Sequence, residues 1–151
     1  MAIRFHEENT VKQKFVRRKI KRWIDGEILR RGKITGEINI IFTSDDFLRT
    51  LNNYYLKRNY FTDIISFDYS ENHTVSGDLF ISTDRVKENA AIYRNDYYQE
   101  LFRVIIHGIL HLLGFKDSTE NEKKVMRKEE NRCLKDLNTV RWPQDQPHCY
   151  L

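Results

Sequence analysis

The chain has 151 residues, of which 40% are hydrophobic and 32% are charged, which is the size and composition of one globular domain. It contains no apolar run long enough to cross a bilayer and no shortage of apolar residues, so membrane-spanning and disordered classes are excluded. The net charge of +4 and the pI near 9.0 favour a polyanionic partner without identifying one.

In chain order, residue patterns predict alternating strands and helices. The first half predicts a short strand at 3–5, a helix capped by Asn9 or Thr10 and running to about Arg31, a strand at 37–43, and a helix at 47–56 capped by Ser44 or Asp45. The second half predicts strands at 64–69 and 77–82, a helix from Thr83 or Asp84 to about Arg94, a long apolar helix at 98–113 capped by Asn95 or Asp96, and a charged helix that follows a capping box at 118–122 and ends near Leu137. Together these elements predict an α+β fold with a small mixed sheet packed against helices.

The number of cysteines indicates the cellular compartment, and the scarcity of glycine and proline indicates the number of domains. Cys133 and Cys149 are too few for a disulfide framework, so we interpret both as free thiols in a reducing compartment. The first residues show no apolar signal region. Glycine and proline are scarce, and there is no linker or repeat. We therefore expect one domain over residues 1–151, located in the cytoplasm, with no membrane partner.

The stretch HGILHLLGFKD, residues 107–117, carries a candidate metal site. His107 and His111 are four residues apart, so their imidazoles project from one face of the predicted helix. Gly114 allows a tight reversal that returns Asp117 toward the histidines as a third ligand. Three protein ligands leave one position open, which is typical of catalytic zinc. The alternatives are two histidines hydrogen-bonded in the core and an Asp117 that caps the next helix.

The same spacing occurs in the metzincin proteases, H-E-x-x-H-x-x-G-x-x-H, with two changes here. Gly108 replaces the glutamate that acts as general base in those proteases, and Asp117 replaces the third histidine. Glycine cannot accept a proton, so a metallopeptidase activity is disfavoured. The sequence identifies no catalytic base.

Three ordered blocks resemble the YbeY family of bacterial metal-dependent endoribonucleases, also described as rRNA maturation factors. The family pattern HGxLHLxGYDH resembles residues 107–117, Leu-Asn…Thr-Asp-Val-Leu-Ser-Phe resembles Leu51-Asn52 with residues 62–67, and Gly-Asp-Ile-x-Ile-Ser resembles residues 77–82. By this resemblance, the zinc histidines of the family fall on His107, His111 and, for the third, Asp117.

The resemblance implies a zincin-like fold with the metal site on a central helix, and one zinc ion. It also implies single-strand-specific cleavage of RNA in 16S ribosomal RNA maturation and ribosome quality control. The implied partners are single-stranded RNA, 16S rRNA in the small ribosomal subunit and, as an optional further partner, a ribosome-assembly GTPase. Two departures from the family, Asp117 and a Leu56 in place of an arginine, keep open an assembly factor that binds rRNA with a non-catalytic metal.

Basic and aromatic residues are the candidate RNA contacts. Phosphate contacts are predicted for basic residues of the first helix and for two that follow Leu56, namely Lys14, Arg17, Arg18, Lys21, Lys57 and Arg58. A solvated outer face is the equally weighted alternative for the helix. The aromatic cluster of Tyr54, Tyr55, Tyr60 and Phe61 predicts stacking with unpaired bases, although packing in the core or against a helix is the interpretation we favour slightly.

Overall fold

A computed structural model of the chain describes residues 2–56 and 62–139. The described residues form, in order, β1 (Ala2–Glu8), α1 (Arg17–Arg30), β2 (Ile34–Thr43), α2 (Asp45–Leu56), β3 (Ile64–Asp68), β4 (Thr74–Ser82), α3 (Thr83–Tyr93), α4 (Tyr97–Leu112) and α5 (Glu120–Leu137). The predicted α+β class is confirmed. The predictions made for Lys57, Arg58, Tyr60, Phe61 and Cys149 lie outside the described residues.

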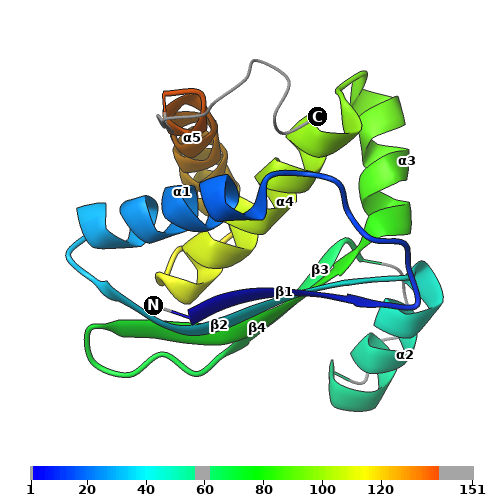
Figure 1. Ribbon diagram of the computed structural model, residues 1–151, viewed down its shortest axis with the longest axis horizontal. Coiled ribbons are helices and arrows are strands. Elements are labelled where there is room, and N and C mark those ends of the chain that lie inside the picture. The colour runs from blue at the N-terminus through cyan, green and yellow to red at the C-terminus, as the bar shows by residue number, and fades with distance from the viewer. Residues whose placement is uncertain (1, 57–61, 140–151) are drawn as a thin grey trace.

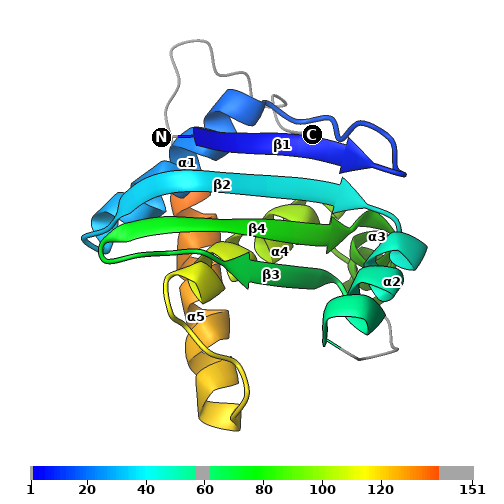
Figure 2. The same cartoon turned by 90° about the horizontal axis from the view of Figure 1, so that it is seen from below.

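The four strands form one mixed sheet in the order β1-β2-β4-β3. β1 and β4 run parallel to β2, whereas β3 is antiparallel to β4 and forms the edge beside the candidate site. Helices α1, α4 and α5 lie over one face of the sheet (Figure 1). Figure 2 looks onto the opposite face, where α2 sits at the ends of the strands. The sheet therefore has one covered face and one face that the described helices leave largely open.

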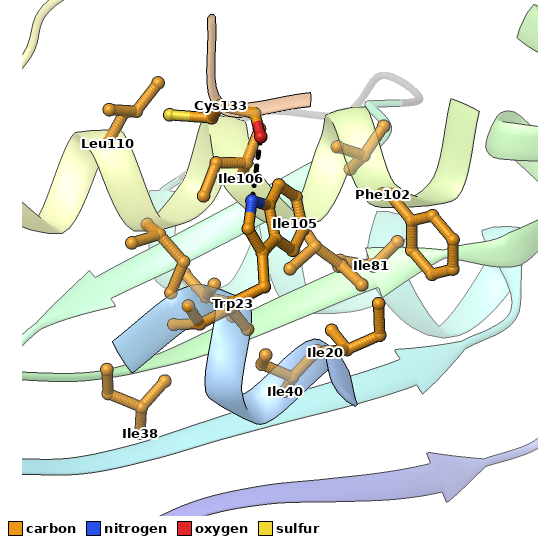
Figure 3. Close-up of a cluster of buried hydrophobic side chains, with 14 of the residues drawn as sticks. Ile20, Trp23, Ile38, Ile40, Ile81, Phe102, Ile105, Ile106, Leu110 and Cys133 are labelled. Atoms are coloured by element: carbon orange, nitrogen blue, oxygen red, sulfur yellow. Dashed lines mark hydrogen bonds between the residues drawn. The ribbon is translucent and has the colours of Figure 1, made fainter. Parts of the chain in front are cut away.

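The core lies between the sheet and the helices above it. Trp23 of α1 is 1% exposed, and its indole Nε1 donates a hydrogen bond to the Cys133 carbonyl of α5 at 2.8 Å (Figure 3). Ile105 of α4 and Ile40 of β2 are fully buried in the same cluster. Burial of large apolar side chains from the sheet and from these helices fixes α4 against the sheet, and α4 carries both candidate histidines.

The predicted start of the first helix is wrong. α1 begins at Arg17, because contacts with β1 and α4 hold the preceding residues in an irregular segment. There, the Gln13 backbone donates to a Glu7 carboxylate at 3.0 Å, and the Gln13 side chain donates to the Val11 carbonyl at 2.9 Å. The ring of Phe15 packs edge-on against Phe5 at 5.3 Å without any helix. Apolar residues at helical spacing therefore belong here partly to a loop.

Most other helix starts follow the predicted caps. Side-chain caps confirm three starts, those of α2 at Ser44, of α4 at Asp96, and of α5 at Thr119 with Glu122 in a capping box. For α3 the prediction is wrong, because the Ser82 hydroxyl accepts the hydrogen bond from the Arg85 backbone. In the described part of the chain, no helix is long and apolar enough to span a membrane.

Candidate metal centre

The last turn of α4 and the loop after it bring the three predicted ligands together. His107 and His111 lie on consecutive turns of α4, and Gly114 follows with a φ of 102°, which a residue with a side chain rarely adopts. The Gly114 backbone donates to the His111 carbonyl and the Phe115 backbone to the Leu110 carbonyl, both at 3.0 Å. This left-handed turn sends the chain back over the helix, as predicted.

The ligand atoms converge closely. His107 Nε2 lies 2.9 Å from His111 Nε2, and Asp117 Oδ2 lies 3.2 Å from the first and 3.4 Å from the second. The three side chains form a group whose possible ligand atoms all lie within 4.8 Å of one another. Each ligand side chain is partly exposed, so the group opens to solvent on one side. Their role as metal ligands remains a prediction.

The outer nitrogen of each ring has an oxygen acceptor. His107 Nδ1 lies 2.6 Å from Glu130 Oε2, and His111 Nδ1 lies 3.1 Å from the Phe115 carbonyl oxygen. An imidazole that donates through Nδ1 presents a lone pair at Nε2. Two such lone pairs and one carboxylate oxygen would then face one another within 3.4 Å, which is repulsive without a cation. The donor set therefore fits a divalent metal.

Glu130 of α5 is a member of the site that the sequence analysis missed. It is 5% exposed, and its second oxygen, Oε1, accepts a hydrogen bond from Arg103 Nη1 at 2.9 Å. Glu130 shares the buried face of α5 with Met126, Cys133 and Leu137, at helical spacing. A carboxylate on an otherwise apolar helix face was the signal in the sequence, because such a group needs a partner inside the protein.

The electrostatics of the metal-free site tie Glu130 to His107. Burial disfavours the charged imidazole, but the hydrogen bond and charge of Glu130, with the charges of Asp117 and Asp63, raise the pKa of His107. Burial also disfavours the Glu130 carboxylate, yet its hydrogen bonds and charge interactions with His107 and Arg103 lower its pKa. Without metal, the two groups therefore favour a charged pair.

A cavity of about 440 Å³ opens in front of the two histidines. Its described lining residues are Asn52, Leu56, Thr62, Asp63, Ile64, Ile65, Ser66, Asp68, His107, His111, Leu112 and Asp117. None of these lining residues is a lysine or an arginine, and three of them are aspartates. Burial raises the pKa of Asp63, although the charge of His107 opposes this. The described wall thus suits a cation better than a phosphate.

The structure places the basic residues of the predicted first helix elsewhere. Lys14, Arg17, Arg18 and Lys21 do not line the cavity. Arg17 pairs with Glu7 of β1 and lies over the Phe5 ring, so it contributes to packing between the helix and the sheet. RNA contact by these four residues stays a prediction.

Gly108 faces the sheet, where it lets α4 approach closely. A Cβ at this position would lie 2.6 Å from Ile64 Cδ1 and 2.9 Å from Leu79 Cδ1. The described packing leaves no room for a glutamate side chain. This gives a structural reason for the missing protease base and further disfavours the metallopeptidase alternative.

Comparison with known proteins gives a consistent result. The sequence model of the family described as Endoribonuclease YbeY matches residues 2–138. A relative from Parabacteroides distasonis, named Endoribonuclease YbeY, is 44% identical over 134 residues, which cover 89% of this chain and 94% of that protein. A relative of the same name from Azobacteroides pseudotrichonymphae is 47% identical, over 86% of this chain and 96% of that protein. Another, from Phocaeicola vulgatus, is 49% identical, over 74% of this chain and 81% of that protein.

A solved structure shares the fold. The solution structure of TM1509 from Thermotoga maritima matches with a TM-score of 0.61, covering 95% of this chain and 99% of that one. The two sequences are 22% identical, so this likeness concerns the fold alone.

Proposed function

The chain belongs to the YbeY endoribonuclease family, and from this we propose that it is a metal-dependent endoribonuclease that cleaves single-stranded RNA in ribosomal RNA processing. The observation that carries the proposal is the convergence of His107 Nε2, His111 Nε2 and Asp117 Oδ2 at the mouth of a cavity. The names of the relatives support the proposed reaction, and the three converging side chains support the proposed metal dependence.

The protein's own residues have distinct tasks in this proposal. His107 and His111 would bind the metal through Nε2, and Asp117 through Oδ2. Glu130 would keep the proton on His107 Nδ1, and the Phe115 carbonyl would do the same for His111. When bound, a metal of this kind activates water at neutral pH and offsets negative charge on phosphoryl oxygens.

The finer parts of the proposal rest on donor chemistry and family resemblance. We propose zinc, since two imidazoles and one carboxylate are a common catalytic zinc set. We further propose that the substrate is 16S rRNA in the small ribosomal subunit, in the cytoplasm, with a role in ribosome quality control and a ribosome-assembly GTPase as an optional partner.

One observation favours a second candidate, an assembly factor that binds rRNA with a non-catalytic metal. Leu56, where the family has an arginine, lines the cavity, and the described wall offers no lysine or arginine to bind a phosphate. This candidate predicts tight RNA binding without cleavage by the metal-loaded protein.

The test combines metal analysis with cleavage of a defined single-stranded RNA. Wild type should retain one metal ion and cut the RNA, whereas His111→Ala should lose both properties. His73→Ala, an exposed histidine in a turn, is the matched control and should behave as wild type. Equal cleavage by wild type and His111→Ala would indicate a contaminating nuclease. Metal retention with RNA binding but no cleavage would favour the assembly factor.

A further inference from the structure

Two tyrosines near the carboxyl end of α2 are exposed to solvent. Tyr54 is 76% exposed and Tyr55 is 59% exposed. Packing in the core, one of the two forms of packing favoured from the sequence, is therefore wrong for both. Leaving two large rings in water has no benefit for folding, since burial is what stabilises aromatic side chains. Both rings are therefore accessible to a ligand.

The exposed rings are held in place from the sheet. Tyr54 packs edge-on against Tyr55 with ring centroids 4.8 Å apart, and Tyr55 packs edge-on against Phe67 of β3 at 5.6 Å. Phe67 in turn packs against Phe80 of β4 at 5.8 Å. A contiguous row of rings thus runs from the sheet to the exposed end of α2. An anchored ring loses little conformational entropy when a ligand stacks on it.

A groove of about 570 Å³ borders these tyrosines. Its described walls combine the rings of Phe47, Tyr54 and Tyr55 with short polar groups such as Thr50 and Asn9. None of the lining residues that the structure describes is a lysine or an arginine. Aromatic faces with hydrogen-bonding groups and no cation suit a flat, uncharged heterocycle better than a phosphate.

The same helix borders the metal cavity. Asn52 and Leu56 of α2 line that cavity, whereas Phe47, Leu51 and Tyr54, at helical spacing, line the groove. One helix thus separates the candidate metal site from the aromatic groove. A nucleic-acid strand with one phosphodiester at the metal would reach the groove by crossing the end of α2.

We propose that Tyr54 and Tyr55 form a stacking platform for bases of single-stranded RNA next to the cleaved phosphodiester. This inference rests on the proposed function and adds a physical reason for its single-strand preference. An unpaired base turns freely onto an exposed ring, whereas a base in a duplex would first have to leave its pair and its stack. The platform binds bases through their faces, so it selects unpaired strands without selecting a sequence.

The test uses short single-stranded oligoribonucleotides that carry 2-aminopurine, a base whose fluorescence is quenched by stacking, at successive positions. With metal-loaded wild type, quenching should appear at the positions that meet the platform. Tyr54→Ala and Tyr55→Ala should each weaken binding about fivefold or more and remove that quenching, raising KM much more than they lower kcat. Tyr54→Phe and Tyr55→Phe keep the rings and should retain the quenching.

Ile92→Ala is the control for loss of a large exposed side chain, because Ile92 is 62% exposed on α3 and lines neither the groove nor the metal cavity. Circular dichroism and metal content verify that each variant is folded and loaded. If wild type binds and cleaves the RNA but both alanine variants quench 2-aminopurine as wild type does, the platform is wrong while the proposed function stands. If wild type neither binds nor cleaves RNA, both proposals fail.

Discussion

Replacing Glu130 by glutamine tests how the protein holds His107. The substitution keeps the shape of the side chain but removes the charge that faces His107 Nδ1 at 2.6 Å and Arg103 Nη1 at 2.9 Å. Carboxylates that support a metal-binding histidine contribute about 10- to 100-fold to metal affinity. That range corresponds to about 1.4–2.8 kcal/mol, and because Glu130 is 5% exposed, solvent screens little of this effect.

Zinc affinity measured by competition with a chromophoric chelator is the appropriate assay. Glu130→Gln should bind zinc about 10- to 100-fold more weakly than wild type while remaining folded. Glu120→Gln is the matched control on the same helix, since the Glu120 side chain is 88% exposed and should not affect the metal. If Glu130→Gln and Glu120→Gln bound zinc equally well, the assignment of Glu130 as the residue that positions His107 would be wrong.

Three further predictions concern stability and reactivity. Gly26→Ala should stabilise the protein by about 1 kcal/mol, because the added Cβ would meet nothing within 4 Å. Gly108→Ala should destabilise it by about 1–2 kcal/mol, because its Cβ would lie too close to Ile64. Urea unfolding measures both effects, and equal effects would contradict the tight packing of α4. Burial raises the pKa of the Cys133 thiol to about 12, so in a Cys149→Ser variant it should react with a thiol reagent only on unfolding; rapid reaction with the folded protein would refute this. In the metal-free protein, Glu130 adds stability that is lost as pH falls through its lowered pKa, and His107 adds stability that is lost as pH rises through its raised pKa. The loss of unfolding free energy caused by Glu130→Gln should therefore be largest between about pH 4.5 and 6.5 and smaller outside this range. A loss that did not change with pH would argue against the charged pair.

The parts of the fold that local chemistry decides were predictable from the sequence. Ser44, Asp96 and Thr119 cap helices because a side-chain oxygen accepts a backbone hydrogen bond a few residues on, which depends on neighbouring residues alone. The start of α1 depended on contacts distant in sequence. Phe15 packs against Phe42 of β2 at 6.0 Å, and spacing along the chain cannot reveal such a contact.

The candidate site also has a part that neighbouring residues predict and a part that depends on contacts distant in sequence. His107, His111 and Asp117 lie within one helix and its terminal turn, so their spacing sufficed to predict that they meet. Glu130 lies on another helix, and its approach to His107 depends on how α5 packs against α4. The direction of Gly108 toward the sheet likewise required the structure, because the sequence showed only that a glutamate was absent.

Locating the metal in crystals of the zinc-loaded protein by anomalous scattering tests the central claim most directly. We expect one ion about 2.0–2.2 Å from His107 Nε2, His111 Nε2 and a carboxylate oxygen of Asp117, with a remaining position open toward the cavity. An ion at another site, or an Asp117 side chain turned away from an ion held by the histidines alone, would contradict this assignment.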